Sequence, residues 1–441
     1  MTKDLTTGNE TKAIVTFAIP LIIGNIFQQL YNIADSVIVG KYIGPSALAA
    51  VGSSFTIMVF LTSIILGLCM GASVLFSQFF GAKQEGELKN SIFTAFVFIG
   101  LVTVVINLCS ILFTDQILQF MNIPVDLFEQ TKQYITIIFY GMGFTFLYNY
   151  FCSLLRAVGN SVVPLVFLIV SAIINIVLDI VFITQFDMGV AGAAYATIIA
   201  QGVSGIATAV YCFIKLPLMR LKAQDCKIHM PMLKKIASYS VLTSIQQSIM
   251  NFGILLIQGL VNSFGVAVMA AFAAAVKIDS FAYMPVQDFG NAFTTYIAQN
   301  KGAEKYDRIK TGIKSAFKLV TLFCILISAA VVLFSEQLML IFVKAEETQI
   351  IAYGVEYLCI VGVFYCLIGY LFLFYGLYRG LGKANMSIVL TVISLGLRVV
   401  LAYVFAPIVG LTAIWWAIPI GWLIADLVGL LCFRKVSKLA L

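Results

Sequence analysis

Long apolar segments with almost no charge recur along the whole chain, and they limit its fold more than any other feature. Each is about 20 residues long, which is enough for an α-helix to cross the hydrocarbon layer of a bilayer. Within lipid, backbone N–H and C=O groups must be satisfied internally, so only helices and closed barrels can span it. Barrel strands would alternate polar and apolar residues, and these segments do not. We therefore expect an all-α integral membrane protein.

Composition agrees with this class and excludes others. Hydrophobic residues make up 61% of the 441 residues and charged residues 11%, whereas soluble domains carry about 25% charged residues. The net charge of +7 comes from basic residues gathered in particular loops, so nucleic acid is not an expected partner. The nine cysteines form no CxxC pair and His229 is the single histidine, which argues against disulfide and zinc sites.

Twelve membrane spans can be assigned from hydropathy. An even number places both termini on one side of the membrane. Connections on that side carry most of the lysine and arginine, such as Lys83, Arg156 and Arg220, while the opposite connections are mainly acidic. The positive-inside rule then predicts cytoplasmic termini. The spans are residues 13–38, 52–80, 91–113, 133–155, 162–184, 190–214, 237–262, 268–298, 313–334, 351–377, 386–406 and 411–432.

An internal repeat divides the chain into halves. Three short motifs, rich in glycine and cations, recur at the same topological positions in both halves. The pairs are residues 81–83 and 302–304, 155–159 and 378–382, and 189–190 and 410–411, at offsets of 221, 223 and 221 residues. Glycine and a cation also cap helix ends in unrelated proteins, which is the alternative reading of each motif.

The repeat predicts two lobes of six helices each. The longest polar break, residues 215–236, lies near the middle and reads as a cytoplasmic linker. We therefore expect an N-lobe at 1–214 and a C-lobe at 237–441. Because six is an even number, the two halves have the same orientation in the membrane, related by an axis along the membrane normal.

Ionisable side chains inside membrane spans are costly, so each is a functional candidate. Asp35 and Asp179 both lie late in spans that run outward, so they can share a depth. Asn175 precedes Asp179 by four residues and faces the same way, and Thr197 lies in the next span. The eight candidates are Asp35, Asp179, Lys277, Asp279, Asp288, Glu356, Arg398 and Asp426.

Asp35, Asn175, Asp179 and Thr197 together offer carboxylate, amide and hydroxyl oxygens, the ligands that hard cations prefer. Such a site would bind Na⁺. A proton serves equally, because burial and a second nearby carboxylate favour the protonated form of an aspartate. The alternative is that both acids reach the membrane interface or cap irregular turns.

Other residues of the first span surround this candidate site. Pro20 removes a backbone donor and marks a point where the helix can bend, although a static kink is the commoner case. Gln28 and Tyr31 precede Asp35 by seven and four residues and share its face approximately. They form a polar and aromatic wall beside the site, with interhelical hydrogen bonding as the alternative. Met142, Asn149 and Met284 are candidates for substrate contact, and core packing is the better reading of each methionine taken singly.

The second half holds ionisable residues whose role stays open. Lys277 and Asp279 are two residues apart and cannot face each other on a helix. Asp288 follows Asp279 by nine residues, Glu356 lies near the start of the tenth span and Arg398 lies within the eleventh. Buried ion pairs that hold the half together are at least as good a reading as a transport role.

Taken together, these motifs resemble the multidrug and toxic compound extrusion (MATE) family, in its prokaryotic DinF-like branch. The similarity covers essentially the whole chain. It is carried by residues 20–22, 28–35, 39–40 and 44 of the first span, and by residues 81–83, 156–160, 175–179 and 189–194.

The resemblance implies a transporter rather than an enzyme, with two six-helix lobes around a V-shaped cavity in the cytoplasmic membrane of a prokaryote. It implies antiport of organic cations or amphiphilic drugs against H⁺ or Na⁺, without a cofactor, by a monomer. It assigns helix bending to Pro20 and contact with the drug to Gln28 and Tyr31. It assigns ion coupling to Asp35, Asn175, Asp179 and Thr197. Other branches carry a coupling glutamate on the seventh helix, but residues 244–251 contain no acid.

Three other functions compete with drug antiport. A lipid-linked sugar flippase of the same superfamily would often have fourteen helices and a strongly basic cavity. A membrane-embedded transferase would need a clustered motif such as DxxD or several histidines, which the sequence lacks. An ion channel would need neither the repeat nor a buried acid pair.

Overall fold

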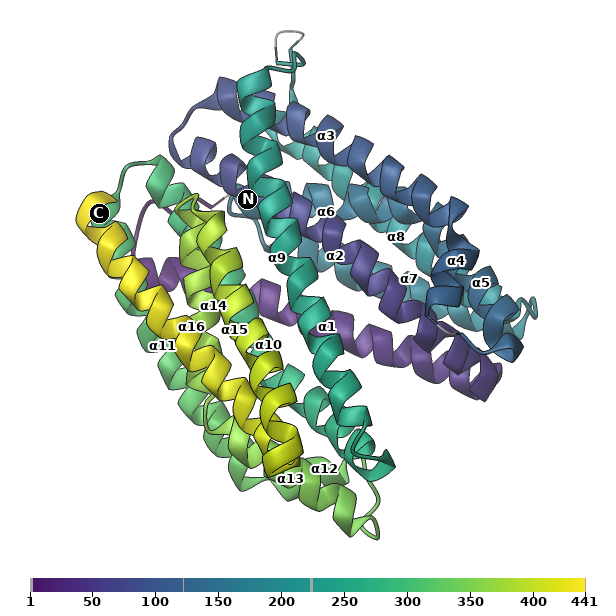
Figure 1. The fold of residues 1–441 in the computed structure, drawn as a ribbon. Coiled ribbons are helices and arrows are strands. Elements are labelled where there is room, and N and C mark those ends of the chain that lie inside the picture. Colours follow the sequence, from purple (N-terminus) through teal and green to yellow (C-terminus); the bar gives the residue numbers. More distant parts are fainter. Residues whose placement is uncertain (1–2, 122, 223–224, 441) are drawn as a thin grey trace. The chain divides into compact units, whose positions relative to one another are not determined.

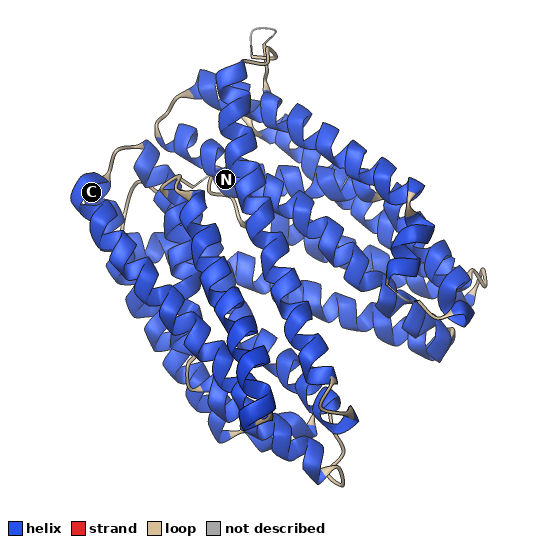
Figure 2. Cartoon of the chain, in the orientation of Figure 1, coloured by secondary structure: helices blue, strands red, loops and turns tan. Residues whose placement is uncertain are grey.

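The computed structural model describes residues 3–121, 123–222 and 225–440, and their regular structure is helical throughout (Figures 1 and 2). The helices are α1 (Glu10–Tyr42), α2 (Pro45–Gly81), α3 (Glu85–Leu112), α4 (Thr114–Phe120), α5 (Val125–Tyr140), α6 (Met142–Ala157), α7 (Val162–Thr184), α8 (Gly189–Lys215), the 3-10 turn η1 (Pro217–Met219), α9 (Met230–Asn262), α10 (Val266–Gly302), α11 (Tyr306–Leu333), α12 (Ser335–Leu340), α13 (Thr348–Gly362), α14 (Tyr365–Gly380), α15 (Ala384–Val409) and α16 (Leu411–Ala440).

Ten of these helices are long and apolar enough to cross a membrane, and two bent pairs bring the number of candidate spans to twelve. Each of the twelve segments assigned from hydropathy falls on one of these helices or pairs, so the predicted all-α membrane fold is confirmed. The sequence did not reveal the two breaks. Segment 133–155 bends by 47° between α5 and α6, and segment 351–377 bends by 54° between α13 and α14.

The chain forms two compact units, and two helices are shared between them. The first unit contains Ile23–Ser244, and the second contains Leu5–Ile22 together with Ile245–Leu441. The start of α1 therefore belongs to the second unit and the start of α9 to the first. These units differ from the predicted lobes, 1–214 and 237–441, in these two half-helices, because hydropathy gives a helix its place in the sequence but not its packing partner.

The first half of α1 packs into the second unit along one face. Ala13, Ile14, Phe17 and Ala18 recur at helical spacing, are at most 4% exposed and belong to the second unit's apolar core. Beyond Ile22 the same helix continues into the first unit. Pro20 lies just before this change of partner, inside an unbroken α1.

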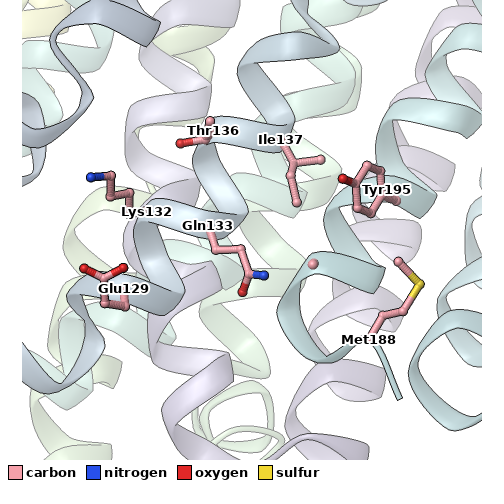
Figure 3. Close-up of a pocket in the computed structure, with 8 residues that line it drawn as sticks. Glu129, Lys132, Gln133, Thr136, Ile137, Met188 and Tyr195 are labelled. Carbon is pink, nitrogen blue, oxygen red and sulfur yellow. The ribbon is translucent and has the colours of Figure 1, made fainter. Parts of the chain in front are cut away.

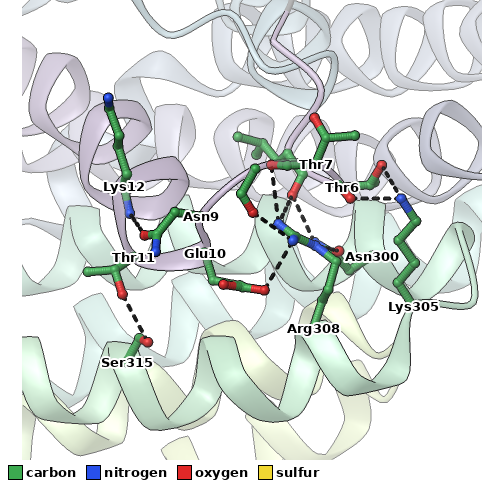
Figure 4. Close-up of polar contacts among 12 residues, drawn as sticks. Thr6, Thr7, Asn9, Glu10, Thr11, Lys12, Asn300, Lys305, Arg308 and Ser315 are labelled. Carbon is green, nitrogen blue, oxygen red and sulfur yellow. Dashed lines mark hydrogen bonds and ion pairs between the residues drawn. The ribbon is translucent and has the colours of Figure 1, made fainter.

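A polar cluster holds the residues that precede α1 against α10 and α11 (Figure 4). Arg308 Nη1 donates to Gly8 O at 2.7 Å and to Glu10 Oε1 at 3.0 Å, and Arg308 Nε donates to Asn300 Oδ1 at 3.1 Å. Lys305 Nζ donates to Thr6 O at 2.8 Å. A guanidinium can donate to several acceptors at once, so Arg308 holds the N-terminal segment before α1 against α10 and α11.

Replacing Arg308 by alanine should release this N-terminal segment. Hydrogen bonds to a charged group contribute about 1.5–3 kcal/mol each, so local opening should become at least roughly tenfold more frequent. Trypsin should then cleave faster at Lys3 or Lys12, as measured by mass spectrometry of the released peptide. Lys310→Ala is the control, because Lys310 has only an exposed contact to Asp307 at 3.9 Å. Equal cleavage rates in the two variants would show that Arg308 does not hold the segment.

The repeated sequence motifs adopt repeated backbone turns. Lys83 and Glu304, which occupy equivalent positions, have φ values of 57° and 56°. In each turn the next residue closes the helix end, with Gln84 N bonding Phe79 O at 3.0 Å and Lys305 N bonding Asn300 O at 2.9 Å. A positive φ also recurs at the paired glycines Gly159 and Gly382, Gly189 and Gly410, and Gly44 and Gly265. In Gly44 and Gly265 it is combined with an extended ψ, -179° and 172°. The internal repeat is thus present in the backbone as well as in the sequence.

The predicted linker is shorter than expected and is partly packed. Helix α9 begins at Met230, within the segment 215–236 that was assigned as linker. Asn90 Nδ2 on α3 donates to Lys227 O at 2.6 Å and to Asp225 O at 3.2 Å, which fastens this part of the chain to the first unit. Residues 223–224 of the predicted linker lie outside the described residues.

Candidate functional site

Two carboxyl groups from different helices meet inside the first unit. Asp35 on α1 and Asp179 on α7 lie within hydrogen-bonding reach of each other. Asp179 is fully buried and Asp35 is half-buried. Each has an oxygen, Oδ1, that is buried and has no hydrogen-bond donor among the described residues. The structure thus brings together the two acids that the sequence placed at a common depth.

Asn175 and Thr197 complete the predicted set and are 1% and 5% exposed. With its amide oriented to satisfy both neighbours, Asn175 Nδ2 donates to Asp179 Oδ2 at 2.9 Å and Oδ1 accepts from Thr197 N at 3.2 Å. Thr197 Oγ1 donates to Ala193 O at 3.0 Å. These bonds tie α7 to α8 and hold the Asp179 carboxyl in place.

Two tyrosines border the acids. Tyr31 lies one turn before Asp35 on α1, and Tyr134 comes from α5; both hydroxyls interact with Thr197. Tyr134 is 3% exposed and packs in an apolar cluster with Ile38 and Val39 of α1. The sequence analysis missed Tyr134, because one tyrosine among 19 carries little signal. Among the tyrosines of the sequence, Tyr134 is distinguished by lying seven residues before Gly141, where α5 gives way to α6.

The electrostatics of this site are unusual for a membrane interior. None of the ion pairs among the described residues involves Asp35 or Asp179. Two adjacent buried carboxylates cannot both stay charged at low cost without a counter-ion. The arrangement therefore suits the binding of one positive charge, either a proton shared by the carboxyls or a metal cation between them.

The residues assigned to substrate contact have different surroundings. Gln28 is exposed on α1, while Asn149 is half-buried on α6 and donates from Nδ2 to Thr145 O at 2.8 Å. Met284 is half-buried on α10 in the second unit. Met142 is 5% exposed within an apolar core cluster. Their assignment to substrate contact stays a prediction.

A surface hollow of about 610 Å³ lies between α5 and α8 (Figure 3). Polar side chains line much of it, including Glu129, Gln133 and Tyr195. Two other lining residues, Ile137 and Ala191, belong to the apolar cluster that contains Tyr134. Neither acid of the pair lines the hollow. Among the residues described, no group of three or more His, Cys, Asp or Glu is arranged to hold a metal.

Comparison with known proteins gives a consistent result. The MatE family model matches residues 20–181 and 240–404. The probable multidrug resistance protein YoeA of Bacillus subtilis is 30% identical over 349 residues, covering 78% of this chain and 75% of YoeA. YpnP of the same organism, also named a probable multidrug resistance protein, is 29% identical over 400 residues, covering 89% and 87%. A crystal structure of a MATE protein in complex with MaL6 superposes with a TM-score of 0.93 at 26% identity, covering 99% of each chain.

Proposed function

This chain belongs to the MatE family of membrane transporters, and on that premise we propose that it exports organic cations or amphiphilic drugs in exchange for an inward-moving cation. It is a transporter and not an enzyme. The observation that carries the proposal is the closeness of two carboxyls in the first unit, the half-buried Asp35 and the buried Asp179. The names of its relatives support multidrug export over transport of a lipid-linked sugar.

In the proposed cycle, the coupling cation and the cationic substrate are bound alternately and never together. When the transporter is open to the outside, Asp35 and Asp179 take up a proton or Na⁺. The local negative charge that favoured a cationic substrate is lost, and the substrate leaves. The loaded transporter then turns inward, releases the ion and accepts a new substrate. Only a difference in affinity between the two states can drive such a cycle.

The geometry supports a proton as the coupling ion. Hard metal cations usually require about six oxygen ligands. Here Asn175 Oδ1 accepts from Thr197 N and Asp179 Oδ2 accepts from Asn175 Nδ2, so two of the oxygens already have a donor. The Oδ1 atoms of Asp35 and Asp179 have none among the described residues. A proton needs only those two atoms.

We further propose that α1 responds to this charge. Tyr31 and Asp35 lie on the part of α1 that belongs to the first unit, while the part before Ile23 belongs to the second. Protonating Asp35 replaces the repulsion between two carboxylates by a hydrogen bond and so changes how Asp35 contacts α7. Pro20, just before the change of unit, is the point where the helix lacks a backbone hydrogen bond. The protein would lie in the cytoplasmic membrane of a prokaryote, with both termini in the cytoplasm and acting as a monomer.

Transport by the purified protein in liposomes tests this proposal. Vesicles receive a fluorescent organic cation such as ethidium, and either a pH gradient, a Na⁺ gradient or neither is imposed. We expect ethidium to move against its own gradient when protons flow down theirs in the opposite direction. A Na⁺ gradient alone should not drive this movement. If a Na⁺ gradient alone drives ethidium transport, the coupling ion is Na⁺ and not a proton. Movement that only follows the ethidium gradient would contradict antiport.

A further inference from the structure

Among the described residues of the second unit, Asp279 and Asp426 are buried acids that the proposed exchange does not use. Asp279 has a hydrogen-bond donor, whereas neither oxygen of Asp426 has one. Asp279 on α10 is 6% exposed, and Tyr357 on α13 donates from its hydroxyl to Asp279 Oδ2 at 3.1 Å. The other oxygen, Oδ1, is buried without a donor among the described residues. A buried carboxyl with one unmet oxygen requires an explanation.

The groups around Asp279 come from several helices. The Tyr365 hydroxyl, from the first residue of α14, is the other nearby donor, and it has no hydrogen-bond partner within the described part of the chain. Tyr283 lies one turn further along α10, and Arg398 extends from α15. Both lie within electrostatic range of Asp279.

Arg398 is close to this acid but is not paired with it. No ion pair joins Arg398 to an acid in the described residues, and its Nε has no hydrogen-bond partner there. The expectation of a buried ion pair in the second half is therefore not met by a direct contact. Instead, a carboxyl, a guanidinium and a tyrosine hydroxyl each have an unused polar atom within one cluster.

Two charged residues close to the Asp279 cluster in sequence, Lys277 and Glu356, have other surroundings. Lys277 is exposed, as expected for a residue two positions from the buried Asp279. Glu356, next to Tyr357, accepts a hydrogen bond from Thr412 Oγ1 at 2.6 Å. Asp279 is thus the acid of this cluster.

The scaffold around the cluster is rigid on one side and interrupted on the other. Trp415 stacks on Phe272 at 5.5 Å and meets Tyr357 edge to face at 5.0 Å, which fixes the tyrosine that bonds Asp279. Tyr365 begins the helix that follows the 54° break between α13 and α14. Interrupted helices within membranes commonly mark ion sites, because the break frees polar groups at that depth.

We propose that Asp279, caged by Tyr357, Tyr365 and Arg398, is a second proton-binding site, separate from the acid pair in the first unit. The cluster can stabilise both protonation states of Asp279. The ionised form is stabilised by the positive charge of Arg398 and by the tyrosine donors, whereas the protonated form can donate to a neighbouring hydroxyl oxygen. A purely structural carboxylate would instead be expected to contact its arginine directly.

Infrared spectroscopy of the protein in lipid nanodiscs tests this site without transport. A protonated carboxyl gives a C=O stretch that disappears when it ionises. In an Asp35→Asn/Asp179→Asn background, we expect such a band to titrate with pH and to be lost in Asp279→Asn. Glu356→Gln, one residue from Tyr357, is the matched control and should keep the band. If the titrating signal is unchanged in Asp279→Asn, the proposal is wrong.

Substitutions that keep shape provide a second measure that does not depend on removing the acid. Tyr357→Phe and Tyr365→Phe should shift the frequency of the Asp279 band by removing hydrogen bonds to it. Arg398→Gln should let the band persist to higher pH, because the charge that stabilises the carboxylate is gone, while Lys277→Gln should not. An Asp279 that stays ionised in all these variants is a structural carboxylate.

The transport assay separates this site from the proposed exchange. In liposomes, Asp279→Asn should still move ethidium under a pH gradient but with one proton fewer per substrate, as measured from the reversal potential. An unchanged ratio would remove Asp279 from the transport cycle. Failure of the wild-type protein to couple to protons would contradict the exchange at Asp35 and Asp179, yet leave the infrared result standing on its own.

Discussion

Asp35→Asn and Asp179→Asn should each abolish proton-driven export while leaving the protein folded. Asparagine keeps the size of each side chain but cannot take up or release a proton. The pair then loses the change in charge that distinguishes the two states of the transporter. Accumulation of ethidium against its gradient should fall by roughly a hundredfold, the effect of losing about 2.7 kcal/mol of preference between two states.

The matched control for this experiment is Asp187→Asn. Asp187 is an exposed acid eight residues after Asp179, and its φ of 49° is a conformation that asparagine also tolerates. It should transport like the wild type. All variants are compared at equal amounts of monodisperse protein in liposomes. Wild-type pumping by both Asp35→Asn and Asp179→Asn would exclude these residues from coupling.

Gly71→Leu should prevent stable folding of the first unit. A Cβ atom at Gly71 would lie 2.3 Å from Tyr239 O and 2.5 Å from Ser240 Cα, and one at Gly67 would lie 2.4 Å from Ser244 Cα. The first half of α9 thus packs backbone to backbone on α2, through two glycines spaced four apart. Since backbone atoms cannot move aside as a side chain can, the two helices would have to separate.

We expect the substitution to cost more than about 3 kcal/mol, above the usual range for overpacking. The measurement is the fraction of monodisperse protein after heating, followed by fluorescence-detected size-exclusion chromatography. Gly52→Leu on the same helix is the control, because a Cβ there meets nothing within 4 Å. If Gly71→Leu melts with the wild type, the contact between α2 and α9 is not as close as the structure has it.

Hydropathy predicted the membrane-spanning segments, because lipid imposes one rule on every residue of a span. The two helix breaks escaped it, since a glycine such as Gly141 inside an apolar segment changes its hydropathy very little. Asp35 and Asp179 could be found because charge is rare within a span. Their neighbour Tyr134 could not, since aromatic residues occur in every span.

The packing of the half-helices also lay beyond the sequence. Periodicity shows that Phe17 lies on an apolar face of its helix but not which helices cover that face. The hydrogen bonds that settle this point, such as Leu5 N to Gln299 Oε1 at 3.0 Å, join residues 294 positions apart. The open roles in the second half had the same cause. Asp279 and Arg398 were visible as charges, but the hydrogen bond from Tyr357 to Asp279 was not.

The division of α1 between two units has a consequence for how the chain is made. Leu5–Ile22 leaves the ribosome early, yet the residues that hold it, Asn300 and Arg308, are synthesised about 300 residues later. The leading half of the first helix must therefore wait for its native partners until α10 and α11 have been made. The second unit can close only when its later helices join a segment made near the start of the chain.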